Sequence, residues 1–228
     1  MTDRAELEAK LAELTQLSAE RGLELRYNLA PLRSAFHNAP LTVEFERDGV
    51  LYTADWSRRL LSYGASKLQS DWDTSKIAST DTWLRSMENA GEKLARRLNR
   101  DFTNNFMMTS TRNLRNEQTG GWNVVHDWNT PYATTLEDAL PAHCANGYLS
   151  KHKHAEQITR AYRGTSDVDD VLRAVERVTK EKDVYFWAPR REGSVVLSLS
   201  RDNGFVVVAI DGVVGGSARG VVVAPKKL

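Results

Sequence analysis

Apolar and polar residues alternate along residues 41–56, on both sides of the dipeptide Asp48-Gly49. Alternation with a period of two predicts β-strands, and Asp-Gly is typical of the two-residue turn of a hairpin. The register that this turn sets places Phe45 opposite Tyr52, so one face of the hairpin is apolar. Because two strands alone are marginally stable in water, we expect helices to cover that face.

Other segments have apolar residues at every third or fourth position, which predicts amphipathic helices. Residues 3–21 carry a stripe of leucines, and we expect this helix to dock onto the body of the protein or to join a coiled coil. Residues 80–106 predict one long helix, and residues 148–162 predict a shorter one. Residues 107–147 have no clear period, so we expect short elements there, held in place by tryptophan side chains.

The last part of the chain predicts one helix followed by strands. Residues 166–178 combine a capping box with a stripe of valines, as expected of a helix that packs on one side. Asn203-Gly204 is a second strong hairpin turn, which sets Leu197 and Leu199 on the same face as Val206. The strands predicted here form an antiparallel meander of residues 184–188, 194–201, 205–211 and 220–224.

Together these patterns predict an α+β protein. The N-terminal part, residues 1–164, is expected to be mostly helical and to carry the hairpin of residues 41–56. Residues 165–228 are expected to form a small subdomain, in which a helix packs on an antiparallel sheet. Gly164 is the predicted boundary between the two parts.

The composition excludes several classes of protein. The chain has 228 residues, 41% of them apolar and 27% charged, which is close to the average of globular domains. This excludes collagen-like and low-complexity chains and argues against global disorder. No apolar run is long enough for a membrane-spanning helix, and the single cysteine, Cys144, suits a reducing compartment. We therefore expect a soluble, cytoplasmic protein that has no membrane partner.

The net charge conceals a separation of charges along the chain. The 31 Lys and Arg residues against 30 Asp and Glu give +1, which argues against a protein that coats nucleic acid through bulk charge. Residues 1–24, however, contain six acids and three bases, whereas residues 85–116 contain seven bases and three acids. One segment of a nearly neutral chain is therefore basic enough to form a local anion-binding surface.

This basic segment leads to the main functional hypothesis. A row of cations on one helix face can neutralise successive phosphates, and an aromatic ring can stack on a base. Projected at 100° per residue, the cations of residues 80–106 gather on one side, and those that follow extend the row. We therefore predict a non-enzymatic binding protein that holds nucleic acid. The candidate contacts are Arg85, Lys93, Arg96, Arg100, Arg112, Arg115 and Trp122.

Three other interpretations stay open. In the first, the cations form an ordinary solvated helix face that Glu88 and Glu92 balance. In the second, they meet an acidic protein surface, such as the acidic N-terminal helix of a neighbouring copy, and the chain forms homo-oligomers. In the third, the protein is a hydrolase that uses His126, Asp127 or Cys144 in a site that the sequence does not display.

The sequence predicts no cofactor and no metal site. His143, Cys144, His152 and His154 come nearest to a metal-binding cluster, but their spacing is not that of a common zinc site. On a helix, His152 and His154 would point about 200° apart and could not bind the same ion. The glycines near residue 216 do not form a phosphate-binding loop, and we expect them to be turn residues.

Overall fold

The computed structural model describes residues 41–47, 49–57, 60–62, 76–126, 139–210 and 217–226. The helix predicted over residues 3–21 lies outside these ranges, as does Asp127. Within them, no helix has both the length and the apolar character that crossing a membrane requires.

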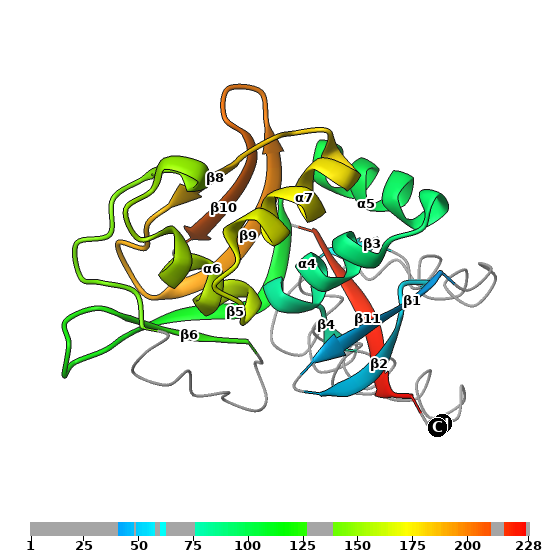
Figure 1. Ribbon diagram of the computed structural model, residues 1–228, viewed down its shortest axis with the longest axis horizontal. Coiled ribbons are helices and arrows are strands. Elements are labelled where there is room, and N and C mark those ends of the chain that lie inside the picture. The colour runs from blue at the N-terminus through cyan, green and yellow to red at the C-terminus, as the bar shows by residue number, and fades with distance from the viewer. Residues whose placement is uncertain are drawn as a thin grey trace, which may run out of the picture.

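Eight of the described strands follow one path of pairing (Figure 1), in the order β1-β2-β11-β5-β9-β10-β8-β7. Strands β11 and β5 pair through one residue of each strand, Ser217 and Met107. The strands therefore form two sheets that meet at β11. Strands β3 and β4 also pair with β11, and β6 pairs with β5. The bounds are β1 Thr42–Arg47, β2 Val50–Asp55, β3 Leu60–Ser62, β4 Lys76–Ile77, β5 Met107–Arg115, β6 Trp122–Val125, β7 Gly147–Tyr148, β8 Val184–Trp187, β9 Gly193–Ser200, β10 Gly204–Ile210 and β11 Ser217–Pro225.

The described part of the chain contains four α-helices and one short 3₁₀ turn, η3. Figure 1 shows α6 and α7 in front of β9 and β10, and α4 between them and the hairpin of β1 and β2. The predicted helix of residues 148–162 is shorter than expected, because β7 and η3 occupy its beginning. The bounds are α4 Thr80–Asn89, α5 Glu92–Asn104, η3 Leu149–Lys151, α6 Ala155–Arg163 and α7 Val168–Thr179.

The prediction of one helix over residues 80–106 is wrong, because the chain leaves the helical conformation at Ala90. This residue has ψ 124°, and Gly91, with ψ 166°, begins α5 in a new direction. The apolar stripe continues across the break because both helices pack against the same core. Buried residues of this stripe are Leu84, Met87, Leu94 and Leu98. A continuous stripe therefore does not require a continuous helix.

The hairpin of residues 41–56 is confirmed. β1 and β2 are antiparallel and Phe45 pairs with Tyr52, as the Asp48-Gly49 turn predicts. The expected helical cover is α4: the indole Nε1 of Trp56 donates a hydrogen bond to Ser86 Oγ on that helix, at 2.9 Å. The hairpin is therefore fixed to α4 through a specific polar contact within an apolar interface.

The prediction of a mostly helical N-terminal part is wrong, because seven of the described strands lie before residue 164. Strand β5 gave no periodic signal, since it is buried on both faces and rich in hydroxyl groups. Its buried polar residues are Thr109, Ser110, Thr111 and Asn113. β5 pairs with β9, and β2 pairs with β11, so strands from both sides of residue 164 pair directly. The division at that residue stays a prediction.

The hairpin of β9 and β10 is confirmed, but its register is shifted by three residues from the prediction, which paired Leu197 with Ile210. Ser200 pairs with Gly204, so residues 201–203 form a three-residue loop. Gly204 has φ +67°, the left-handed conformation that closes such a loop and that glycine adopts readily. Leu197 consequently faces Val207. The predicted meander is also wrong, because β8 runs parallel to β10 and β11 leaves to pair with β2.

A chain of aromatic rings connects the hairpin, the helices and the second sheet. The ring centres of Trp56 and Trp83 are 4.4 Å apart, and those of Trp83 and Phe102 are 5.0 Å apart. Phe102 meets Phe205 of β10 edge to face at 5.1 Å. All four side chains are fully buried. Aromatic pairs of this kind stabilise a core beyond the area they bury, so these rings hold the two sheets and α4 and α5 together.

Candidate functional site

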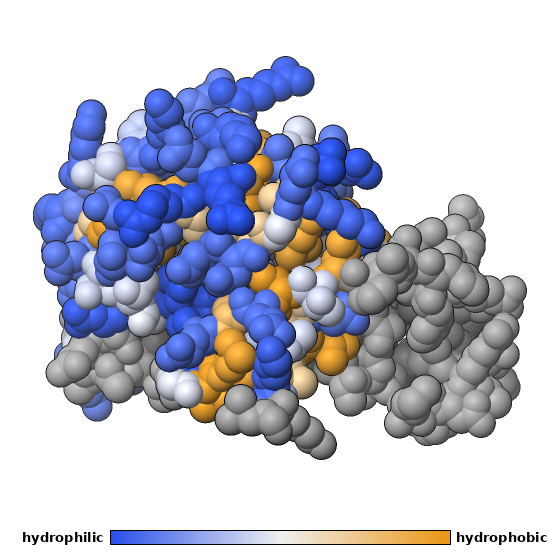
Figure 2. All heavy atoms as spheres, turned by 45° about the vertical axis from the view of Figure 1, so that its right-hand side comes forward, coloured by the Kyte–Doolittle hydropathy of each residue, from blue (hydrophilic) through white to orange (hydrophobic). Residues whose placement is uncertain are grey.

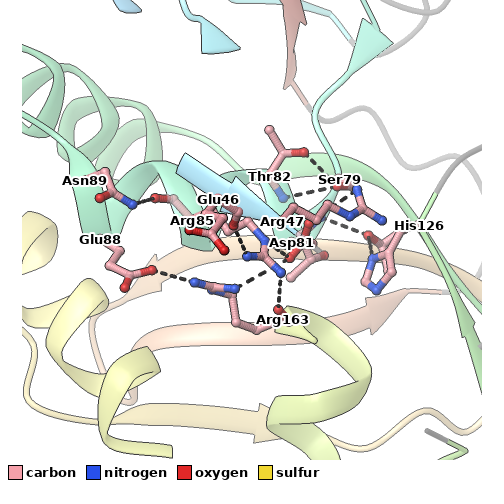
Figure 3. Close-up of polar contacts among 12 residues, drawn as sticks. Glu46, Arg47, Ser79, Asp81, Thr82, Arg85, Glu88, Asn89, His126 and Arg163 are labelled. Carbon is pink, nitrogen blue, oxygen red and sulfur yellow. Dashed lines mark hydrogen bonds and ion pairs between the residues drawn. The ribbon is translucent and has the colours of Figure 1, made fainter. Parts of the chain in front are cut away.

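An acidic side chain is buried among arginines at the start of α4 (Figure 3). Asp81 is 3% exposed, and its Oδ1 lies 2.6 Å from Nε of Arg85 and 3.9 Å from Nη1 of Arg163. Arg47, at the end of β1, approaches the other carboxylate oxygen to 3.6 Å. A buried charge requires such partners, because an isolated ion in a protein interior is strongly destabilising. We call these four residues the Asp81 cluster; it joins β1, α4 and α6.

Arg85, the first of the predicted nucleic-acid contacts, therefore forms its contacts inside the protein. Its side chain is 11% exposed, and it also donates hydrogen bonds to the carbonyl oxygens of Glu46 and Arg163, at 2.5 and 3.2 Å. Arg163 in turn forms an ion pair with Glu88 at 2.5 Å. The structure separates Arg85 from the cations of α5, with which the sequence had grouped it.

His126, which follows β6, is also held inside the protein. Its Nε2 lies 2.9 Å from the carbonyl oxygen of Ala161, so Nε2 donates and Nδ1 accepts from the Thr111 hydroxyl at 3.1 Å. Burial lowers the pKa of His126 from its ordinary value of 6.5, although the nearby Asp81 carboxylate acts in the opposite direction. The imidazole is therefore neutral, with both ring nitrogens engaged by the protein.

Lys93, Arg96 and Arg100 are exposed along α5. Arg96 lies 3.4 Å from Glu92, and both side chains are more than 70% exposed, so the pair contributes little to stability. Figure 2 brings this side of the molecule forward and shows hydrophilic residues over much of its described surface. Three of the predicted contacts thus share one solvated helix face.

The remaining predicted contacts lie on β5 and β6. Arg112 is half-buried where β5 pairs with both β6 and β9, whereas Arg115 is exposed at the end of β5. The guanidinium carbon of Arg115 lies 5.0 Å from the centre of the Trp122 ring, a cation–π distance. Trp122 is only 4% exposed and gives a base little surface for stacking. From Met107 to Arg115, strand β5 spans about 26 Å of strand rise.

An open groove of about 490 Å³ lies beside Arg115. Three segments that are distant in the sequence form it: the β5–β6 hairpin, the segment before β7, and the link between β8 and β9. We call it the Arg115–Arg190 groove. Its polar and aromatic lining residues are Arg115, Trp122, His143, Cys144, Asn146 and Arg190. It brings together two of the seven residues that the sequence predicts, Arg115 and Trp122.

Backbone hydrogen bonds fix the walls of the Arg115–Arg190 groove. The N–H groups of Trp122 and Leu140 each donate to the carbonyl oxygen of the other, at 2.9 and 2.8 Å. On the opposite wall, Asn146 Oδ1 accepts a hydrogen bond from the Ala188 N–H at 2.9 Å. The β5–β6 hairpin, which carries Arg115, and the link after β8, which carries Arg190, are thus each hydrogen-bonded to the segment of residues 140–146.

The groove combines positive and negative groups. Arg115, His143 and Arg190 are exposed there. Glu192 lies close by, where its Oε1 accepts a hydrogen bond from the Arg115 backbone N–H at 2.7 Å. Burial raises the pKa of the Cys144 thiol to about 11, against the opposing effect of Lys153. The groove therefore offers guanidinium and imidazole groups to a ligand, and its thiol stays protonated at neutral pH.

The residues of the hydrolase interpretation lie in different surroundings. His126 contacts Thr111 and Ala161, whereas Cys144 lines the Arg115–Arg190 groove. Across the part of the chain that the structure describes, no three His, Cys, Asp or Glu side chains form a group that could hold a metal ion. His152, a possible metal ligand that the spacing in the sequence argued against, has its Nε2 2.8 Å from the Ala145 carbonyl oxygen.

The sequence did not identify Arg190, His143 or Asn146 as parts of a site. Arg190-Arg191 after Pro189 is a signal for a basic loop, but nothing local connects that loop with Arg115. The loop comes to lie beside Arg115 because β8, which precedes it, pairs with β10 on one side and with β7 on the other. Comparisons with protein-family models, with curated proteins and with solved structures give no match for this chain.

Proposed function

We propose that this chain is a non-enzymatic binding protein that holds a phosphate-bearing ligand, with nucleic acid as the favoured ligand, in the Arg115–Arg190 groove. The observation that carries the proposal is the convergence of Arg115 and Arg190, from distant segments, on one groove. A cytoplasmic location belongs to the same proposal, because the single cysteine suits a reducing compartment.

Arginine is well suited to this role. Its planar guanidinium presents several N–H donors and can hold a phosphate through two parallel hydrogen bonds. The Arg115 side chain lies over the Trp122 ring, so part of its orientation is set before a ligand arrives. A binding group that is already oriented loses less conformational entropy on binding.

The size of the groove also supports a ligand site. Its volume of about 490 Å³ lies within the roughly 300–1,000 Å³ of typical ligand sites. A mononucleotide unit fits such a volume, and a longer strand would continue beyond it along the surface. Because the net charge is only +1, binding must depend on this local arrangement and not on the charge of the whole protein.

The test is binding of a fluorescently labelled single-stranded 12-mer, measured by anisotropy at low salt. The variant Arg115→Ala with Arg190→Ala should bind at least about tenfold more weakly, because hydrogen bonds to charged groups contribute about 1.5–3 kcal/mol each. Arg96→Ala with Arg100→Ala removes the same charge from α5 and is the matched control; it should stay within about threefold of the unmodified protein.

Two results would contradict this proposal. Unchanged affinity of the groove variant would exclude the groove as the binding site. A large loss of affinity in the α5 variant instead would place the interface on the helix face of Lys93, Arg96 and Arg100.

The second candidate is assembly of copies of this chain through α5. Phe106, two residues after the end of this helix, is 65% exposed, and an apolar ring beside a basic face is typical of protein contacts. Light scattering of the full chain tests it. An oligomer that dissociates in the variant Arg96→Glu with Phe106→Ser would support assembly at α5, whereas a monomer at high concentration would contradict it.

A further inference from the structure

Strands β7 and β8 present a row of aromatic side chains outside the core. Along β8, Val184 and Phe186 are buried, so the alternation of a strand turns Tyr185 and Trp187 to the other face. Tyr148 of β7 pairs with Tyr185. We call Tyr148, Tyr185 and Trp187 the aromatic row.

The three rings form a connected surface. Tyr148 meets Tyr185 edge to face with ring centres 5.0 Å apart, and Tyr185 meets Trp187 in the same way at 6.4 Å. These contacts fix the rings relative to one another. Tyr148 and Trp187 nevertheless remain 42% and 44% exposed, which is unusual for large aromatic side chains with no role at the surface.

The aromatic row adjoins the Arg115–Arg190 groove through the chain itself. Trp187 is followed directly by Ala188, Pro189 and Arg190, which line the groove. At the β7 end, Asn146 lines the groove two residues before Tyr148. The hydrogen bond from the Ala188 N–H to Asn146 Oδ1 holds these two ends together at 2.9 Å. Aromatic rings and arginines thus meet where β7 and β8 leave the sheet.

We propose that the aromatic row stacks on the bases of a single-stranded nucleic acid whose phosphates lie at Arg115 and Arg190. This inference rests on the proposed function and specifies its ligand. Aromatic rings stack on every base, because each base has a π-face, and they therefore bind a strand with little dependence on its sequence. A duplex covers the faces of its bases by stacking them inside the helix, so a platform of this kind selects single strands.

The arrangement divides the binding energy between two sets of groups. The groove arginines act on phosphates, which every nucleic acid shares, and the aromatic row acts on bases. A 12-mer of abasic deoxyribose phosphates keeps the first interaction and lacks the second. Comparison of this abasic strand with oligo-dT of the same length therefore separates the two contributions.

The experiment measures anisotropy with both labelled strands and with a 12-base-pair duplex. The unmodified protein should prefer oligo-dT to the abasic strand by about tenfold or more, the effect expected of one or two stacked bases. The variant Tyr148→Ala with Trp187→Ala should lose this preference while its affinity for the abasic strand stays unchanged. Trp187→Phe should keep most of the preference, because the ring survives.

Val223→Ala is the control, since it shortens another exposed large apolar side chain outside the aromatic row. It should leave the affinities for both strands unchanged. Circular dichroism establishes that each variant is folded before its affinity is compared.

The possible failures are distinguishable. If the groove variant loses affinity for both strands but the aromatic variant binds as the unmodified protein does, the aromatic row is not a stacking surface and the proposed function stands. Equal affinity of the unmodified protein for oligo-dT and the abasic strand, or for single strand and duplex, would likewise overturn the stacking proposal. Absence of binding to all three probes would overturn the proposed function as well.

Discussion

Arginines are buried in one region of this molecule and exposed in another. In the Asp81 cluster, the side chains of Arg85 and Arg163 are about nine-tenths buried and contact an acidic side chain. In the Arg115–Arg190 groove, both arginines are exposed beside an open volume. A count of basic residues along the chain therefore does not locate a binding surface. Burial and internal partners decide which arginines remain available to a ligand.

The largest expected effect comes from removal of the buried acid. Asp81→Asn should destabilise the protein by about 3–5 kcal/mol, because it leaves the charges of the surrounding arginines without their shared partner. Urea unfolding at pH 7 measures this change. Glu92→Gln, which breaks only an exposed pair, is the control and should change stability by less than about 1 kcal/mol. A difference of under 1 kcal/mol between the two variants would refute the structural role of the cluster.

The next effect tests the groove wall. A Cβ atom added at Gly121 would lie 2.1 Å from the carbonyl oxygen of Leu140, far inside contact distance. Gly121→Ala should therefore lower the free energy of unfolding by about 2 kcal/mol through strain. It should also displace the pairing of Leu140 with Trp122, the residue whose ring Arg115 contacts. Nothing lies within 4 Å of the same position at Gly91, so Gly91→Ala should be nearly neutral by the same unfolding assay. Equal stabilities of the two variants would contradict the described packing.

A smaller effect on stability depends on pH and comes from a buried side chain, His126, and not from the groove. The pKa of His126 is lowered in the folded protein, so below pH 6.5 the unfolded chain binds a proton that the folded protein resists. Stability should therefore be complete above pH 6.5 and fall with decreasing pH, by at most about 1.4 kcal/mol per unit from this group. Unfolding curves at pH 7.5 and 5.5 measure the fall. In His126→Gln the fall should be smaller; an identical fall in both proteins would contradict the burial of this imidazole.

The smallest stability effect should come from the groove arginines. Arg115→Ala with Arg190→Ala should lower the free energy of unfolding by no more than about 1 kcal/mol, since both side chains are exposed and only Arg115 loses a ring contact. Arg85→Ala in the Asp81 cluster should cost several times as much. Thermal unfolding of both variants under one condition makes the comparison, and equal losses would show that the two regions are not distinct.

Local signals in the sequence predicted the elements that depend on local interactions. The Asp48-Gly49 turn fixes the register of β1 and β2, and the helix of residues 166–178 appears as α7. At Asn203-Gly204 the turn was located correctly, but its length was not, because glycine also closes three-residue loops. The break at Ala90 escaped prediction because the apolar stripe passes through it.

The sheet centre and the groove could not be predicted for a different reason. Strand β5 is buried on both faces and many of its residues are polar, so neither alternation nor an apolar run marks it. The groove depends on pairings between distant segments, which bring Arg190 beside Arg115. Of the predicted contacts, Arg115 and Trp122 line the groove together because they pair across β5 and β6, which are neighbours in the sequence. The burial of Arg85 could not be predicted, because the sequence does not show that Asp81 and Arg163 enclose it.

We propose that phosphate binds to the groove arginines and not to those of α5 or the Asp81 cluster. Salt dependence of oligo-dT binding tests it most directly, because each phosphate contact to a single strand contributes about 0.7 to the slope of log K against log salt concentration. In Arg115→Ala with Arg190→Ala the slope should decrease in magnitude by about 1.4, whereas in Arg96→Ala with Arg100→Ala it should stay as in the unmodified protein. An unchanged slope in the groove variant would contradict the account.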